Sequence, residues 1–267
     1  MKILFAVQGT GNGHISRARM MAKHLQSQPN IDTTYLFSGR ARKDFFDMEI
    51  FGDFLHRRGL TFHSQNGRVS YFKTLTTNNS FQFLREVYTL DLSAFDLVVC
   101  DFEPVAAWAA RLRGKPIIGL GHQYAFAHDA PRAGSNFIAD LVMRYFAPAN
   151  ESLGLHWHHF NAPILPPIID PSLTRTTEVS NKIVVYLPFE DQARVQKLLL
   201  SMPDYHFVIY APELRDDERS NLSLRKTSHT AFKRDLMSAN GVICNAGFEL
   251  ISAVSYTHLT LPTTPVV

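Results

Sequence analysis

The chain has 267 residues, of which 45% are hydrophobic and 19% charged, a composition typical of a folded protein of one or two domains. Its formal net charge of +3 is too small to argue for a nucleic-acid-binding protein. The sequence has no apolar run of about 18 residues and no secretory leader pattern, so we expect no transmembrane helix and a cytoplasmic location. Cys100 and Cys244 each end an apolar run and are expected to be buried thiols without a disulfide.

The first half of the chain alternates apolar strand patterns with amphipathic helix patterns. A strand over 2–8 is followed by a glycine-rich turn and by a helix from Ile15, in which apolar residues recur at helical spacing. Nearly continuous apolar strands that alternate with helices indicate a parallel sheet covered on both faces. The further elements predicted are strands over 33–37, 60–63, 69–72, 96–100 and 116–120, and helices over 40–47, 80–92, 104–113 and 135–146.

A proline-rich segment then interrupts the alternation. Residues 161–171 read NAPILPPIIDP, and a polar stretch follows them, which is typical of an interdomain linker. The pattern restarts with strands over 182–187, 205–210 and 241–244 and helices over 192–200 and 230–239. We therefore predict an α/β protein with two Rossmann-like domains, the first over 1–163, a linker over 164–181, and the second over 182–252.

The last residues have an unusual sequence. The stretch 254–263, VSYTHLTLPT, resembles the translation of a transposon-type sequencing adapter, although a genuine strand is the alternative. We expect residues 253–267 to be a non-native tail and exclude them from the fold prediction. On this expectation the second domain is truncated after Ser252.

The glycine loop VQGTGNGHISRA, at residues 7–18, follows the first strand. Its glycines are Gly9, Gly11 and Gly13, and His14 stands after them, so neither the dinucleotide fingerprint nor the phosphate-binding P-loop is matched. Small residues before a helix still allow close approach of a ligand to free backbone N–H groups, although a tight turn is the structural alternative. An imidazole at this place could accept a hydroxyl proton.

Polar residues follow two later strands of the predicted first sheet. Asp101 and Glu103 lie in CDFEP, and His122 and Gln123 lie in GHQ. Because the carboxyl ends of parallel strands share one edge, we expect these side chains to lie near His14. Glu103 has a structural alternative, since a carboxylate before Pro104 suits the N-terminus of a helix.

Two further patterns are weaker. HWHH at 156–159 resembles a metal cluster, but it lacks a cysteine or carboxylate at ligand spacing, and on a strand its last two histidines would point to opposite sides, so no metal site is predicted. Phenylalanines interleaved with basic residues could form a membrane-facing patch, although a core role is favoured. These residues are Phe45, Phe46, Phe51 and Phe54, with Arg40, Arg42, Lys43, Arg57 and Arg58.

Together, GTGNGHISRA, DFEP, GHQ and CNAGFELIS resemble a family, namely the bacterial and archaeal glycosyltransferase-like proteins of the two-Rossmann GT-B class. These proteins are distant relatives of the N-acetylglucosaminyltransferase that forms lipid II. The resemblance covers nearly all of residues 1–252. It implies an acceptor-binding first domain, a nucleotide-sugar-binding second domain, chemistry in the cleft between them, and no metal or cofactor.

The resemblance also assigns residues. Gly9, Gly11, Gly13 and His14 match the acceptor-side loop, and Asn245 to Glu249, with Gly247 and Phe248 among them, match the donor-side turn, whose helix N-terminus would face a diphosphate. Family members carry a glutamate at the position of Ala253. This departure implies that the chain is an inactive fragment of an enzyme.

Three functions stay open. In a glycosyltransferase, His14 would deprotonate the acceptor hydroxyl with help from Asp101, and the partners would be a nucleotide-sugar and an unknown glycan or lipid-linked acceptor, with peripheral membrane contact. In a two-Rossmann nucleotide-sugar epimerase, Asp101 and Glu103 would serve as acid and base. The third function is a non-catalytic sugar-binding module.

Overall fold

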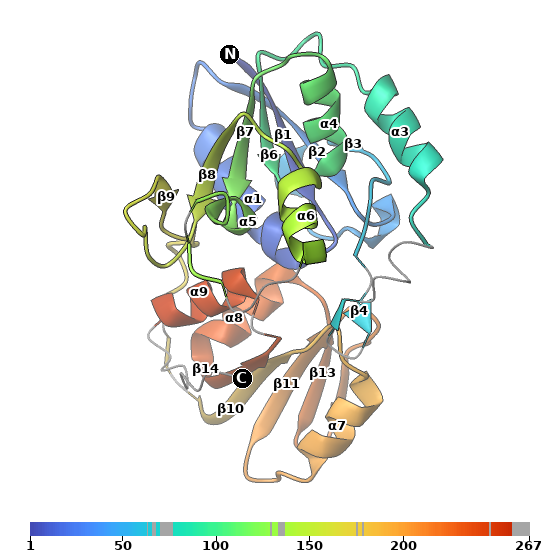
Figure 1. Ribbon diagram of the computed structural model, residues 1–267. Helices are drawn as coiled ribbons and strands as arrows, with labels where there is room; N and C mark the ends of the chain where they lie inside the picture. Colours follow the sequence, from blue (N-terminus) through green and yellow to red (C-terminus); the bar gives the residue numbers. More distant parts are fainter. Residues whose placement is uncertain are drawn as a thin grey trace. The chain divides into compact units, whose positions relative to one another are not determined.

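The computed structural model describes residues 1–62, 77–128, 130–132, 137–174, 176–177, 179–245 and 247–257, and the backbone of 64–65 and 68–69. It divides into two compact units, the first comprising Met1–Phe62 and Tyr71–Ile168 and the second comprising His63–Ser70 and Ile169–Val267 (Figure 1). Each unit is built on its own α/β sheet, as the sequence predicts. Among the described helices, none is both long enough and apolar enough to cross a bilayer.

The first unit is built on a parallel seven-stranded sheet. Its strand order is β3-β2-β1-β6-β7-β8-β9, so β1, buried over six of its seven residues, lies near the middle. β4 (Ser64–Gln65) and β5 (Arg68–Val69) pair with each other and belong to the second unit. Without them the order counted along the chain is 3-2-1-4-5-6-7, and its first six strands have the doubly wound arrangement. The strands are β1 (Lys2–Gln8), β2 (Asp32–Ser38), β3 (Leu55–His56), β6 (Leu97–Asp101), β7 (Ile117–Gly121), β8 (Glu151–Leu155) and β9 (Ile164–Leu165).

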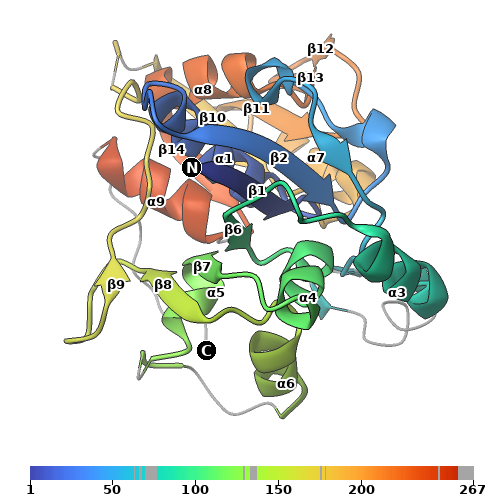
Figure 2. The same ribbon diagram turned by 90° about the horizontal axis from the view of Figure 1, so that it is seen from above.

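Helices cover both faces of this sheet. Figure 2 shows α1 on one side of β1 and β2, and α3 and α4 on the other. Successive side chains of β1 point to opposite faces of the sheet, which explains why both faces are covered. Leu4 and Ala6 pack into the core with the alanines of α4, while the side chains between them face α1. The helices of this unit are α1 (Asn12–Leu25), α3 (Ser80–Thr89), α4 (Pro104–Leu112), α5 (His122–Ala125) and α6 (Phe137–Tyr145).

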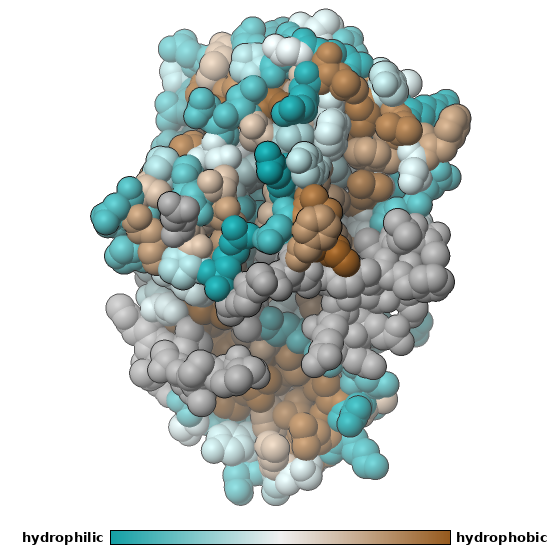
Figure 3. Space-filling model, in the orientation of Figure 1, coloured by the Kyte–Doolittle hydropathy of each residue, from teal (hydrophilic) through white to brown (hydrophobic). Residues whose placement is uncertain are grey.

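Two of these helices leave apolar side chains in contact with solvent. Phe81 on α3 is 79% exposed and Phe137 on α6 is 76% exposed. Leu84 and Tyr88 of α3 and Leu141 of α6 are exposed as well, and Figure 3 shows apolar surface over both helices. Scattered exposed apolar residues are ordinary, but apolar residues that share one face of a helix, as on α3 and on α6, mark a surface suited to an apolar partner.

Several sequence predictions for the first half of the chain were wrong. The expected helix over 40–47 is only a 3₁₀ turn at Arg42–Asp44, and residues 60–62 form no strand. Of the expected strand over 69–72, the structure shows Arg68–Val69 paired with Ser64–Gln65, and residues 70–72 lie outside the described part. Strands β3 and β8 were not predicted. β3 has only two residues and β8 carries polar residues, so each is recognised only by its pairing with a neighbouring strand.

The phenylalanine-rich segment belongs to the core of the first unit. Phe37 of β2 packs against Phe51 and Phe54 with ring centroids 4.7 and 5.2 Å away, and Phe45 lies 5.6 Å from it. Arg42 lies over the Phe54 ring at 4.3 Å and so covers the cluster from outside. The core interpretation is therefore confirmed for Phe51 and Phe54, which are buried, and Phe45 packs against the same cluster.

The second unit contains a five-stranded sheet of order β12-β13-β11-β10-β14. Four strands are parallel, and β12 pairs antiparallel with β13 at the edge, a hairpin that the sequence analysis did not predict. Among the parallel strands the chain order is again 3-2-1-4. The elements are β10 (Val179–Tyr186), β11 (His206–Ala211), β12 (Asp217–Arg219), β13 (Leu222–Lys226) and β14 (Ala239–Cys244), with α7 (Gln192–Leu200), α8 (His229–Ser238) and α9 (Phe248–Tyr256).

The predicted linker and tail overlap regular structure. The segment 164–181 contains β9, which pairs with β8 at the edge of the first sheet, and the start of β10. Helix α9 runs through Ala253 to Tyr256, while residues 258–267 lie outside the described part of the chain.

Candidate functional site

The candidate site lies where the strand order of the first sheet reverses. Strands β1 and β6 are direct parallel neighbours, with Val7 opposite Asp101. β1 continues into α1 on one face of the sheet, and β6 continues into α4 on the opposite face. The carboxyl ends of the two strands therefore leave a crevice between these connections. His14, from the start of α1, and Asp101, from the end of β6, meet there.

The centre of the site is a buried carboxylate. Asp101 Oδ1 lies 2.6 Å from His14 Nδ1 and accepts a bond from Arg17 Nη2 at 2.7 Å, while Oδ2 accepts from Arg17 Nε at 2.8 Å. Arg17 therefore binds the carboxylate through two parallel bonds, the strongest geometry for such a pair. Asp101 is fully buried, Arg17 is 2% exposed and His14 is 17% exposed, so only the imidazole of the three reaches solvent appreciably.

The charges of this cluster fix its protonation. Burial by itself would raise the pKa of Asp101, but the Arg17 guanidinium and His14 outweigh that effect and the pKa lies below its usual range. Asp101 is thus an ionised acceptor, and we assign the proton between the two residues to His14 Nδ1, which leaves Nε2 as the basic nitrogen. This is the arrangement in which a carboxylate orients a histidine that accepts protons.

The GHQ segment, where β7 ends and α5 begins, reaches the same site through Gln123. Gln123 Nε2 lies 3.4 Å from His14 Nε2, and its Oε1 is buried without a hydrogen-bond partner in the described structure. A Cβ at Gly121 would approach Arg17 Nη2 and Asp101 Oδ1 to 3.2 Å, so glycine leaves room for the ion pair. His122 turns away and bonds the Leu155 carbonyl at 3.0 Å, and burial lowers its pKa.

The three loop glycines have different environments. A Cβ at Gly9 would meet the Ser38 carbonyl oxygen at 2.7 Å and the Phe45 ring at 2.6 Å, so Gly9 is required by packing. Gly11 is the N-cap of α1, has open space around its Cβ position, and provides no side-chain cap for the helix N–H groups. Gly13 lies within the first turn of α1. Gly11 is therefore the position that leaves the helix N-terminus open to a ligand.

Glu103 lies in the structural position that the sequence analysis gave as its alternative. Its carboxylate caps α4 by accepting bonds from the N–H groups of Val105 at 3.0 Å and Ala106 at 2.6 Å, and it accepts the Ser38 hydroxyl at 2.6 Å. It is fully buried, and burial raises its pKa to about 7. Phe102, between Asp101 and Glu103, has a left-handed backbone with φ +54°. Asp101 and Glu103 therefore do not point to the same side, as residues two apart would in a regular strand.

Arg17 is the functional residue that the sequence analysis missed. It stands three residues after His14 on α1, which places the two side chains on the same face of the helix. The signal was present in the sequence GHISRA, where an arginine falls within the apolar spacing of Ile15 and Ala18. An arginine on a buried helix face implies a buried acidic partner, because an unpaired charge would be too costly there.

The donor-side residues predicted in the second unit lie at its own strand-order reversal, between β10 and β14. Asn245, directly after β14, donates from Nδ2 to Glu190 Oε1 at 3.0 Å, and its Oδ1 is buried without a partner in the described structure. Gly247 is the N-cap of α9 and has no side-chain cap, while Phe248 and Glu249 form the first turn. Ala246 lies outside the described residues.

The HWHH segment forms a turn and not a strand. The rings of His158 and His159 stack with centroids 4.7 Å apart, instead of pointing to opposite sides, and His156 packs against His122 at 5.3 Å. Over the described part of the chain, no three His, Cys, Asp or Glu residues are grouped closely enough to hold a metal ion.

Comparison with known proteins gives the family. The model of glycosyl transferase family 1 matches residues 1–267. Among solved structures, Phytolacca americana UGT2 complexed with UDP-2fluoro-glucose and pterostilbene is similar over 97% of this chain and 79% of its own, at 12% identity and a TM-score of 0.59. The S. aureus MnaA–UDP structure is similar over 92% of this chain and 74% of its own, at 9% identity and a TM-score of 0.56.

A UDP-N-acetylglucosamine 2-epimerase is similar over 91% of this chain and 73% of its own, at 13% identity and a TM-score of 0.53. At these identities the likenesses show the fold alone, which is the GT-B arrangement of two Rossmann-like units. No curated protein sequence matches the chain. Because the family model spans the whole sequence, the chain belongs to glycosyl transferase family 1.

Proposed function

We propose that this protein transfers a sugar from a nucleotide-sugar to an acceptor hydroxyl, with His14 as the general base and without a bound metal. The observation that carries the proposal is the pairing of His14 Nδ1 with the buried Asp101 carboxylate at 2.6 Å. This pairing leaves the basic Nε2 on the side of the ring that faces Gln123. A base fixed in this way can act without a metal-bound nucleophile.

In the proposed reaction, His14 Nε2 takes the proton of the acceptor hydroxyl while its oxygen bonds to the anomeric carbon. The bond from that carbon to the nucleoside diphosphate breaks, and the diphosphate leaves with the electron pair. Asp101 holds the ring and stabilises the imidazolium that forms, as a carboxylate does in an Asp–His pair. Arg17 keeps Asp101 ionised and oriented through its two bonds.

We place the donor at the N-terminus of α9. Gly247, the N-cap of α9, provides no side-chain cap, and the N-terminus of a helix stabilises phosphate charge. Structural neighbours were solved with UDP or with a UDP-sugar, which supports a nucleotide-sugar as the donor class. For the acceptor, the exposed apolar side chains of α3 and α6 favour a molecule with an apolar or lipid-linked part.

The epimerase alternative is less well supported by the site. Elimination chemistry would need Asp101 and Glu103 as acid and base. Asp101 is fully buried and bound through both oxygens, and Glu103 caps α4 with its own carboxylate. Neither carboxylate is available to a substrate without loss of the contacts that hold the local fold.

The experiment measures release of nucleoside diphosphate from a panel of nucleotide-sugars with and without acceptor alcohols. His14→Ala is expected to lower turnover by about 10²–10⁴-fold, the usual contribution of a positioned base. His24→Ala, an exposed histidine on the same helix, is the matched control and should leave turnover unchanged. Near-native turnover of His14→Ala would remove the base assignment, and release of free sugar without any acceptor would favour the epimerase.

A further inference from the structure

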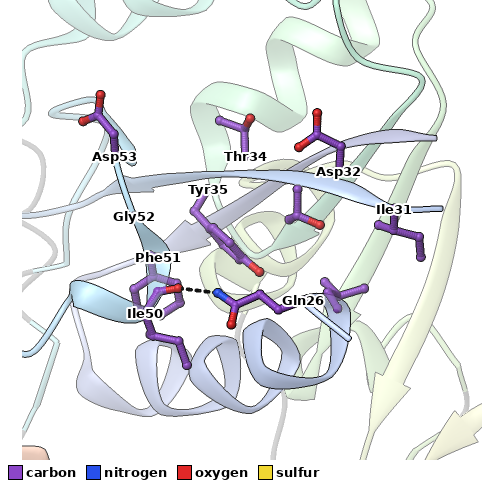
Figure 4. A pocket seen from close by; sticks show the side chains of 11 residues that line it. Gln26, Ile31, Asp32, Thr34, Tyr35, Ile50, Phe51, Gly52 and Asp53 are labelled. Carbon is purple, nitrogen blue, oxygen red and sulfur yellow. Dashed lines mark hydrogen bonds between the residues drawn. The ribbon is translucent and has the colours of Figure 1, made fainter. Parts of the chain in front are cut away.

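The first unit has a cavity at the opposite end of its parallel strands from His14. It has a volume of about 380 Å³ and lies between the amino end of β2, the end of α1 and the 3₁₀ turn Glu49–Phe51. Figure 4 shows the side chains around it. Its apolar lining consists of Leu25, Ile31, Ile50 and Phe51, and its polar lining on the α1 side of β2 consists of Gln26, Thr33 and Tyr35.

Two hydroxyl groups of this cavity are unsatisfied. Tyr35 is 3% exposed, and neither its hydroxyl nor Thr33 Oγ1 has a hydrogen-bond partner among the described residues. Both residues stand on the same face of β2, because they are two positions apart in a strand. Buried hydroxyls are nearly always bonded, so a pair that lacks partners at one cavity wall indicates that something else bonds them.

The charge around the cavity limits what it can bind. Among its lining residues there is no lysine, arginine or histidine, so an anion would find no counter-charge. Asp32 and Asp53 also line the cavity, and in Figure 4 their carboxylates point away from Tyr35, so a polar group bound at Tyr35 does not face them. Burial raises the pKa of Tyr35 to about 12, which keeps its hydroxyl neutral.

Gln26 closes one side of the cavity. Its Nε2 donates to the Ile50 carbonyl at 2.8 Å, and Figure 4 shows the Tyr35 hydroxyl directed toward this side chain. Gln26 is exposed, so its side chain can turn toward solvent at the cost of one hydrogen bond. That movement would uncover the Tyr35 hydroxyl from the cavity side.

We propose that this cavity binds a small uncharged molecule with an apolar body and a hydroxyl or carbonyl end. The apolar body lies against Ile31, Ile50 and Phe51, and the polar end bonds the hydroxyls of Tyr35 and Thr33. Such a site is separate from the His14 cluster, because the two lie at opposite ends of the same parallel strands.

The test uses 4-methylphenol as the probe, with toluene and 4-methylbenzoate as probes that lack the polar end or carry a charge. Binding is measured by ligand-observed NMR and by titration calorimetry. We expect 4-methylphenol to bind more tightly than either of the other two. Equal binding of toluene and 4-methylphenol, or no binding of any probe, would overturn the proposal.

Two isosteric variants separate this site from chance binding. Tyr35→Phe and Thr33→Val remove only the unsatisfied oxygens, so both should fold at least as well as the parent, since an unpaired buried group is lost. Each should weaken 4-methylphenol binding by about five- to tenfold, the effect of one hydrogen bond. Tyr205→Phe, an exposed tyrosine of the second unit, is the control and should bind as the parent does. A lower melting temperature of Tyr35→Phe with unchanged probe binding would instead assign the hydroxyl to a structural water.

Discussion

The buried pair of Arg17 and Asp101 should be coupled far more strongly than an exposed pair of the same length. Both side chains are at most 2% exposed, and two bonds of 2.7 and 2.8 Å join them. Asp101→Asn leaves a buried guanidinium without its counter-charge, and Arg17→Met leaves a buried carboxylate in the same condition. Each change should cost about 3–5 kcal/mol of unfolding free energy.

The double variant removes both charges at once, so its cost should be much less than the sum of the two single changes. We expect a coupling free energy of at least about 2 kcal/mol in the double-mutant cycle. The assay is urea unfolding followed by tryptophan fluorescence, because Trp108 and Trp157, the two tryptophans of the chain, both belong to the first unit.

The control is Arg132 and Asp140, an ion pair with a similar distance of 2.6 Å whose side chains are 45% and 52% exposed. The cycle Arg132→Met with Asp140→Asn should give a coupling below about 1 kcal/mol, because solvent screens exposed charges. Additivity of the Arg17 and Asp101 changes to within about 0.5 kcal/mol would refute the reasoning, since independent sites behave in that way.

Three further predictions follow from single residues. Burial raises the pKa of Glu103 from 4.5 to about 7, so its contribution to the unfolding free energy is full below pH 4.5 and is lost as the pH rises through 7. The loss should amount to roughly 3 kcal/mol. Urea unfolding should therefore give a lower unfolding free energy at pH 8 than at pH 5, and Glu103→Gln should lack this difference. Gly9→Ala should destabilise by about 1–3 kcal/mol in thermal unfolding, since its Cβ would meet a carbonyl oxygen at 2.7 Å, whereas Gly11→Ala, with open space, should change stability by less than about 1 kcal/mol. Gly247→Val and Glu249→Ala should weaken nucleotide-sugar binding in calorimetric titration without unfolding the first unit, and unchanged donor affinity in both would remove them from the site.

Most of the regular structure could be predicted because strands and helices carry local periodic signals. The sequence shows these signals directly. Runs of apolar residues predict the strands over 2–8 and 241–244, and the spacing of apolar residues predicts the helix over 192–200. The short strands β3, β8 and β12 could not be predicted. Each is stabilised chiefly by hydrogen bonds to a neighbouring strand, and that neighbour is not visible in the local sequence.

The sequence by itself determined that polar residues follow the ends of β1, β6 and β7, and parallel strands bring such ends to one edge. Only the tertiary structure decided which of them touch. His14 and Arg17 reach Asp101 across more than 80 residues of chain, whereas Glu103, two residues further on, turns to cap α4. The physical reason is that a buried charge must be paired, and its partner is chosen by the packing of distant segments and not by the residues beside it.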